Sequence, residues 1–144
     1  MTVPFPLPDP DFEPTRPFFA AAARGELRIP RCRRCDRFQW YPPERCRACG
    51  SSELEWVQTS GRGTLFSFAV VRKPLLRELA PLVPFATGLV ALAEDPAVRL
   101  VTRFVDCDLE RLRPDLPVRA VFLPLGHPRV PAWSIVVPFF TPAE

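Results

Sequence analysis

The sequence has almost no histidine, the side chain that most often acts as the general base of a hydrolytic active site. It contains a single histidine, His127, in a loop before Pro128. No motif places a serine or cysteine nucleophile beside this histidine. A lone loop histidine is more typical of a surface residue than of a catalyst. We therefore expect no catalytic residue on this chain, and we expect any associated chemistry to lie on a partner.

Long apolar segments are also missing. No run of 18 apolar residues is present, which excludes a membrane-spanning helix. The first residues lack both the basic region and the apolar region of a signal peptide. Apolar residues make up 47% of the 144 positions, enough for one ordinary core or for a small core with a satellite. We expect a globular protein of the cytoplasm, where thiols stay reduced.

Cysteine, by contrast, is concentrated in one short stretch. Residues 32–49 contain two C-x-x-C pairs separated by ten residues: Cys32, Cys35, Cys46 and Cys49. Each pair is expected to form a tight turn that directs two thiolates at one ion, which predicts a structural zinc site with one zinc per chain. Because the four thiolates fill the coordination sphere, the metal has no open position for water. Two disulfides, four free thiols or a rubredoxin-type iron centre remain alternatives.

Basic charge comes almost entirely from arginine, with 18 arginines, a single lysine and a net charge of +3. Seven arginines surround the cysteines: Arg28, Arg31, Arg33, Arg34, Arg37, Arg45 and Arg47. They form either a solvated surface that offsets the charge of a zinc–thiolate centre or an anion-binding patch for phosphate or an acidic partner. The low net charge and the single lysine argue against a nucleic-acid-binding protein.

The N-terminal third is expected to hold an arm, a helix and a ribbon. Six of the 20 prolines lie in the first 17 residues, so residues 1–16 are predicted to form an extended, polyproline-like arm or a disordered terminus. Residues 17–24, rich in alanine and followed by Gly25, are predicted to form a helix. Strands over 26–30 and 53–58 flank the cysteines and complete a zinc ribbon within residues 17–58.

The remaining residues, 59–144, alternate between apolar strands and turns. Strands are predicted over 65–72, 85–92, 98–105, 117–123 and 132–138, with helical turns over 106–113. Helical turns between the third and fourth strands match the order of a five-stranded OB-fold barrel. A sandwich or an SH3-like barrel is the alternative. Within the first strand, the alternation of Phe66, Phe68 and Val70 predicts that all three face the barrel core. The predicted fold class is therefore mainly β.

Several motifs together resemble one known family, the zinc-ribbon and OB-fold acyl-CoA-associated proteins of domain of unknown function 35. The resemblance covers roughly residues 17–140. Its carriers are Pro17-Phe-Phe-Ala-Ala-Ala-Ala-Arg-Gly-Glu-Leu-Arg28, the cysteine pairs with Tyr41-Pro-Pro43 between them, Cys46-Arg-Ala-Cys-Gly-Ser-Ser52, Glu55-Trp56 and Ser60-Gly-Arg-Gly-Thr-Leu-Phe-Ser67. The chain departs from the family at Phe19, where tryptophan is usual, and at Asp36 and Asp115-Leu116, where glycine is usual.

This resemblance implies a non-catalytic subunit of a hetero-oligomer. Relatives assemble with thiolase-superfamily enzymes, including lipid-transfer-protein-type aldolases of steroid side-chain breakdown and acetoacetyl-CoA thiolase complexes. Their OB domain helps to hold an acyl-CoA thioester, while the ribbon and N-terminal helix contact the enzyme. In this chain, the expected partner contacts are Phe18, Phe19, Trp40 and Tyr41. The phosphates of CoA are expected to contact Arg62, Arg72 and Arg99.

The sequence allows an alternative function for the chain and an alternative role for one of its turns. A zinc ribbon with an OB barrel also serves as a nucleic-acid-binding module, in which Phe66 and Phe68 would stack on bases. The turn from Gly61 to Gly63 either only reverses the chain or presents backbone N–H groups to a phosphate. The fifth cysteine, Cys107, is expected to be buried as a small apolar residue.

Overall fold

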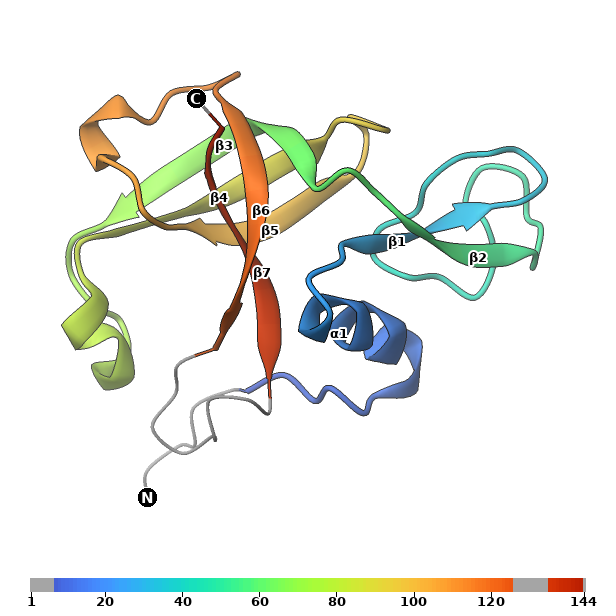
Figure 1. Ribbon diagram of the computed structural model, residues 1–144, viewed down its shortest axis with the longest axis horizontal. Coiled ribbons are helices and arrows are strands. Elements are labelled where there is room, and N and C mark those ends of the chain that lie inside the picture. Colours follow the sequence, from blue (N-terminus) through green and yellow to red (C-terminus); the bar gives the residue numbers. More distant parts are fainter. Residues whose placement is uncertain (1–6, 126–134, 144) are drawn as a thin grey trace.

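The computed structural model describes residues 7–125 and 135–143, and it is mainly β, as predicted. A barrel and a smaller two-stranded ribbon lie side by side, and helix α1 lies against both (Figure 1). The helical elements are η1 Glu13–Thr15, α1 Arg16–Ala23, η2 Arg77–Leu82 and η3 Leu109–Arg111. The ribbon strands are β1 Arg28–Cys32 and β2 Leu54–Gln58. The barrel strands are β3 Arg62–Val71, β4 Phe85–Leu92, β5 Arg99–Phe104, β6 Pro117–Pro124 and β7 Val136–Pro142.

Helix α1 begins and ends within one residue of its predicted bounds. Pro17 occupies the first turn, where the missing N–H removes no hydrogen bond. At the other end Gly25 adopts a left-handed φ of 76°, and its N–H donates to the carbonyl of Ala22. The N–H of Glu26 then donates to the carbonyl of Ala21, which completes a Schellman cap. The cap turns the chain directly into β1.

The sequence predicted that the arm is extended as far as helix α1, but the structure shows a turn and a short helix before it. The Asp9 carboxylate accepts a hydrogen bond from the backbone N–H of Asp11, and the carbonyl of Phe12 accepts from Thr15 and Arg16. These bonds form a turn followed by η1, so the prediction is wrong for residues 13–15. Proline in the first turn of a helix removes no hydrogen bond, which allows Pro14 to lie in η1. Residues 1–6 lie outside the described part.

The five barrel strands close in the order β3-β4-β5-β7-β6, which is the order of an OB fold. The predicted helical turns between the third and fourth barrel strands are the single turn η3, whose N-cap residue Asp108 accepts a hydrogen bond from the N–H of Glu110. Strands β5 and β7 are parallel and pair at one position, Phe104 with Phe140. Away from that pair no backbone ladder joins the two strands in the described part of the chain, and the Thr102 hydroxyl donates to the carbonyl of Pro138 at 3.5 Å, so this part of the wall is an open seam in the ladder.

The ribbon and the barrel share one hydrophobic core. Leu65, Val90 and Phe140 are fully buried in the barrel, and Leu27 and Ile29, at the start of the ribbon, pack into the same cluster. The Thr59 N–H and hydroxyl both donate to the carbonyl of Leu27, which fixes the chain where it leaves the ribbon. The position of the ribbon is therefore set partly by the barrel core.

Strand β3 contains a bulge that reverses the predicted orientation of Phe66. Leu65 pairs with Val90 and Ser67 pairs with Leu89, so Phe66 is an extra residue between the two pairs. As a result Leu65 is fully buried, whereas Phe66 is 44% exposed. Strict alternation placed Phe66 in the core, and that prediction is wrong because the bulge shifts the register by one residue.

The fifth barrel strand also differs from its predicted bounds of 132–138. Residues 132–134 lie outside the described part, and β7 runs on to Pro142, which pairs with Val118 of β6. Pro138 does not end the strand. It pairs with Phe122 on one side, and on the other side it has no backbone pairing with β5, only a hydrogen bond from the Thr102 hydroxyl to its carbonyl at 3.5 Å, so its missing N–H breaks no ladder bond.

Candidate metal centre and apolar groove

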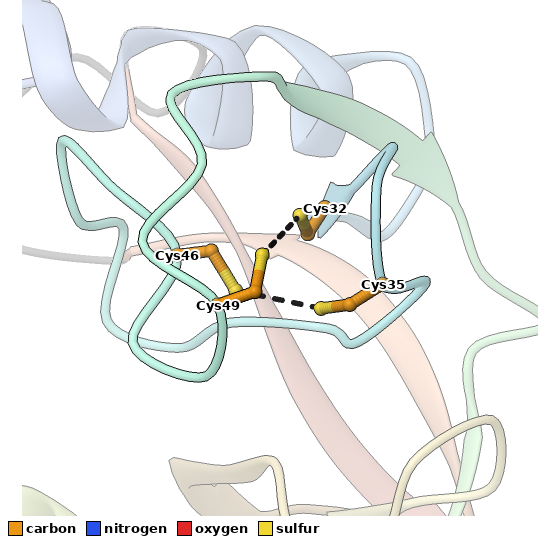
Figure 2. A group of neighbouring side chains, drawn as sticks. All are labelled: Cys32, Cys35, Cys46 and Cys49. Atoms are coloured by element: carbon orange, nitrogen blue, oxygen red, sulfur yellow. Dashed lines mark hydrogen bonds between the residues drawn. The ribbon is translucent and has the colours of Figure 1, made fainter.

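The four cysteines of the two C-x-x-C pairs converge on one point, as Figure 2 shows. The Sγ atoms of Cys32 and Cys49 are 3.6 Å apart, as are those of Cys35 and Cys46, and all four sulfurs lie within 4.8 Å of one another. A tetrahedral zinc ion bound by four thiolates places the sulfurs roughly 3.8 Å apart. The four thiols are free, which excludes the two disulfides. They are positioned to hold one metal ion.

Two similar turns present the sulfurs. In the first pair the N–H of Asp36 donates to the carbonyl of Cys32, and Asp36 has a left-handed φ of 62°. In the second pair the N–H of Gly50 donates to the carbonyl of Cys46, and Gly50 has a φ of 78°. Glycine is usual at the first of these positions, but aspartate is among the residues that tolerate a left-handed backbone. The substitution therefore leaves the turn intact.

The electrostatics of the four thiols are strongly uneven. Backbone N–H groups of Cys49 and Ala48 lower the pKa of Cys46 to about 6, against the opposing effect of burial. A backbone N–H from Arg37 acts to lower the pKa of Cys35, but burial and the neighbouring thiol of Cys46 raise it to about 12. One thiolate thus makes ionisation of the next unfavourable. A bound cation removes this repulsion, as a thiolate metal site requires.

Gln39 is a functional residue that the sequence did not reveal. Its side chain is buried, and its amide nitrogen Nε2 lies 3.4 Å from Sγ of Cys46. Its amide oxygen accepts a hydrogen bond from the backbone N–H of Arg47 at 3.2 Å. The guanidinium of Arg47 in turn donates to the carbonyl of Tyr41. Gln39 therefore connects the second cysteine pair to the segment that carries Trp40 and Tyr41.

The four predicted partner contacts come together along one wall of an apolar groove of about 360 Å³. Phe18 packs on Trp40 with ring centroids 4.9 Å apart, and Phe19 and Tyr41 extend this cluster on either side at 5.4 Å and 5.3 Å. Trp40 and Phe18 also pack against the shared core, whereas Tyr41 is 57% exposed. Helix α1 and the ribbon thus contribute to one surface.

The opposite wall of the groove comes from the open seam of the barrel. It is formed by residues 100–103 of β5 and residues 137–140 of β7. The guanidinium of Arg103 lies over the ring of Phe139, 4.8 Å from its centroid, and is the charged group of the groove lining. Burial lowers the pKa of Arg103 because it removes water from the charged form.

The three arginines predicted to contact CoA do not form one patch. Arg62 begins β3 and Arg72 follows its last residue, so the ten-residue strand separates them by roughly 30 Å. Arg72 forms an ion pair with Glu110 at 3.4 Å. Arg99 lies on β5 with its guanidinium 3.8 Å from the ring centroid of Phe66. A role for these arginines in CoA binding stays a prediction.

The other candidate residues have ordinary structural surroundings. Cys107 is half-buried against the core, and burial followed by the charge of Asp106 raises the pKa of its thiol, which disfavours a nucleophilic role. His127 lies outside the described residues. Among the ribbon arginines, Arg31 and Arg33 both pair with Glu55, at 3.1 Å and 3.0 Å. In the described part of the chain no helix is long and apolar enough to cross a bilayer.

Comparisons with known proteins agree with this architecture. Residues 19–55 match the family described as "ChsH2, rubredoxin-like zinc ribbon domain", and residues 56–123 match the one described as "ChsH2, C-terminal OB-fold domain". A solved structure named "Ltp2-ChsH2(DUF35) aldolase" superposes with a TM-score of 0.77 and 26% identity, covering 97% of this chain and 100% of that chain. A DUF35 protein of unknown function from Sulfolobus solfataricus shares the fold, with a TM-score of 0.56, 12% identity, and coverage of 88% of this chain and 83% of that one.

Two curated relatives are named as subunits of hydratases. A "probable enoyl-CoA hydratase alpha subunit" from Thermomonospora curvata is 30% identical over 122 residues, covering 79% of this chain and 37% of the relative. The "3-oxo-4,17-pregnadiene-20-carboxyl-CoA hydratase alpha subunit" of Mycobacterium tuberculosis is 35% identical over 85 residues, covering 59% of this chain and 24% of the relative. The chain thus spans 37% or less of the length of these two relatives.

Proposed function

Since the chain belongs to the ChsH2-type DUF35 family, with a rubredoxin-like zinc ribbon followed by an OB fold, we propose that it is a non-catalytic accessory subunit. In this proposal it binds a thiolase-superfamily enzyme, of the lipid-transfer-protein-type aldolase or acyltransferase class, and helps to bind the acyl-CoA substrate. The name of the similar aldolase structure and the names of the hydratase subunits support a role beside enzymes of CoA thioesters.

The observation that carries the proposal is the aromatic groove. Phe18, Phe19, Trp40 and Tyr41 come from two separate segments, yet they meet on one surface beside the barrel seam. Clustered aromatic residues around a depression are typical of the centre of protein–protein interfaces. A helix, a metal ribbon and a barrel edge that all face the same groove form a surface suited to a large partner.

A structural role for the metal agrees with this view. Cys32, Cys35, Cys46 and Cys49 would hold one zinc ion as a closed tetrathiolate, which supplies folding energy to the ribbon and has no position for substrate. Within residues 7–125 and 135–143, these cysteines form the one cluster of three or more metal-binding side chains. The hydratase relatives extend well beyond the region matched by this chain, and we propose that their chemistry lies in those other parts.

We propose that the barrel is the part of the chain that contacts CoA. Arg62 on β3 and Arg99 on β5 are both exposed, with β4 between the two strands, so each is accessible to a phosphate. Arg72 lies at the other end of β3 and already pairs with Glu110, so we expect it to contribute least. Substitution of Arg62 and Arg99 by glutamine is then expected to weaken binding of an acyl-CoA by the assembled complex more than substitution of Arg72.

Co-expression with a thiolase-superfamily enzyme from the same organism tests the proposal. We expect a stable complex in which acyl-CoA turnover requires the enzyme, and we expect this chain alone to turn over no acyl-CoA. Turnover by the isolated chain would contradict the proposal, as would binding of single-stranded nucleic acid at nanomolar strength. A Trp40→Ala variant is expected to weaken the complex at least tenfold, because a central interface tryptophan removed from an aromatic cluster commonly costs about 2 kcal/mol or more.

A further inference from the structure

The apolar groove contains one positively charged side chain, which a purely hydrophobic docking surface would not need. Its walls are apolar and aromatic, but they include the guanidinium of Arg103, which lies against the ring of Phe139. Among the described residues no carboxylate lies within 4 Å of this guanidinium, although five other arginines form ion pairs of that kind. Arg103 is therefore a partly buried positive charge for which the described residues provide no counter-charge.

A charge in this position is costly until it is paired. Burial removes part of the hydration of the guanidinium, and the ring of Phe139 compensates for only a small part of that loss. A carboxylate that enters the groove would accept hydrogen bonds from Arg103 in surroundings that exclude water, where charge-assisted bonds are strongest. The same carboxylate would find no other positively charged group in the groove lining.

The barrel seam indicates what kind of molecule carries the carboxylate. Strand β5 pairs with β4 along residues 99–104, but on its other side it pairs with β7 only at Phe104. On that side residues 100–103 line the groove and have no backbone pairing in the part of the chain that the structure describes; the one hydrogen bond to β7 there is long, from the Thr102 hydroxyl to the carbonyl of Pro138 at 3.5 Å. An extended polypeptide can pair with such an edge, and its alternate side chains then point into the groove.

We propose that the groove receives an apolar, extended segment of the partner protein that carries an aspartate or glutamate, and that Arg103 pairs with this carboxylate. The inference rests on the proposed function, because it names the chemistry by which the partner is recognised. Phe18 and Trp40 contact the apolar side chains of the segment, and Arg103 fixes its register along β5.

Peptide titration followed by NMR of the ¹⁵N-labelled full-length chain tests the pairing without the partner. The probes are acetyl-Leu-Phe-Asp-Leu-amide and the isosteric neutral acetyl-Leu-Phe-Asn-Leu-amide. The resonances to follow are the indole N–H of Trp40 and the side-chain Nε–H of Arg103. We expect both resonances to shift, with roughly tenfold tighter binding of the aspartate peptide. This preference is expected to vanish in Arg103→Gln and to return in part in Arg103→Lys.

The matched control is Arg119→Gln, which removes an exposed arginine of β6 outside the groove and leaves the preference unchanged. Equal binding of the two peptides, no shift with either peptide, or a preference that survives in Arg103→Gln would overturn the inference. Displacement of the aspartate peptide by butyryl-CoA from the same resonances would show a thioester site and overturn the choice of a protein segment. Failure of the complex to form in co-expression would count against the proposed function alone.

Discussion

The side-chain amide of Gln39 donates a hydrogen bond to Sγ of Cys46 over 3.4 Å, and both side chains are buried. Cys46 also accepts from the backbone N–H of Ala48 at 3.3 Å. Donors of this kind stabilise the negative charge of a thiolate ligand and fix its direction. Groups in the outer shell of a metal site commonly alter its metal affinity by 10–100-fold. Gln39 is thus a positioning residue for the metal centre.

The variant Gln39→Glu removes this hydrogen bond and adds a negative charge beside the thiolate. The two side chains have the same shape, and an oxygen remains to accept from the N–H of Arg47, but the donor to Cys46 is lost. We expect zinc affinity to fall roughly 10–100-fold. Competition with a chromogenic chelator measures it. Arg45→Gln is the control, since Arg45 donates to the carbonyl of Gly50 and reaches no thiolate in the described contacts. Equal losses in the two variants would remove Gln39 from the metal site.

Metal binding is expected to release protons at neutral pH. In the metal-free ribbon the pKa of Cys35 is raised to about 12, and that of Cys49 is also raised from its ordinary value of 9.0, so both thiols are protonated at pH 7.4. Cys46, with a pKa of about 6, is already a thiolate. Since the metal takes only thiolates, affinity rises with pH and is lost on acidification. Titration calorimetry in buffers of different ionisation enthalpy is expected to show release of at least two protons per zinc.

Replacement of Cys46 by serine is expected to unfold the ribbon and leave the barrel largely folded. The hydroxyl is a poor zinc ligand, and the ribbon has little core apart from the residues that it shares with the barrel. Hydrogen exchange is expected to show loss of protection in β1 and β2 while β4 stays protected. Because Leu27 and Ile29 belong to the shared core, the melting temperature of the barrel is expected to fall by several degrees. Simultaneous loss of protection in β2 and β4 would contradict this order.

At the bulge, the backbone of β3 approaches Gly88 of β4 so closely that a larger residue there is expected to destabilise the barrel. A Cβ atom added there would overlap the carbonyl oxygen of Ser67 and lie 2.8 Å from Cα of Phe68, both of them backbone atoms. We expect Gly88→Ala to lower the free energy of unfolding by roughly 3 kcal/mol. Gly61→Ala is the comparison, because its new Cβ meets only Ala120 at 3.5 Å and the cost is the left-handed φ, roughly 1 kcal/mol. Urea unfolding measures both. If Gly88→Ala costs no more than Gly61→Ala, the strands do not approach this closely.

Features that depend on neighbouring residues in the sequence could be predicted. The spacing of Cys32, Cys35, Cys46 and Cys49 defines the metal site, and the alanine run before Gly25 defines α1. The arrangement of strands with one helical turn before the fourth barrel strand was enough for the OB order. The family resemblance assigned Phe18 and Trp40 to the same predicted partner surface, and their rings are in contact in the structure.

Features that depend on contacts between residues far apart in the sequence could not be predicted. Phe66 points outward because β4 pairs with β3 across a bulge, and no local pattern in β3 encodes that shift. Gln39 is an unremarkable polar residue in the sequence, and its role appears only when the second cysteine pair folds over it. The groove beside Arg103 lies where no backbone ladder joins β5 and β7 in the described part of the chain, and those strands are more than thirty positions apart in the chain.

The single pairing between β5 and β7 also has a consequence for how related proteins can diversify. The barrel is held closed by Phe104 and Phe140 and by the longer ladders elsewhere, and Leu100 and Thr102 of β5 are buried. Val101, Arg103 and Val137 lie outside the buried core on this part of the wall, so substitutions at these three positions can change size or charge at little cost in stability. A duplicated copy of the protein could therefore acquire a different partner by drift along this seam while its barrel and its metal ribbon stay the same.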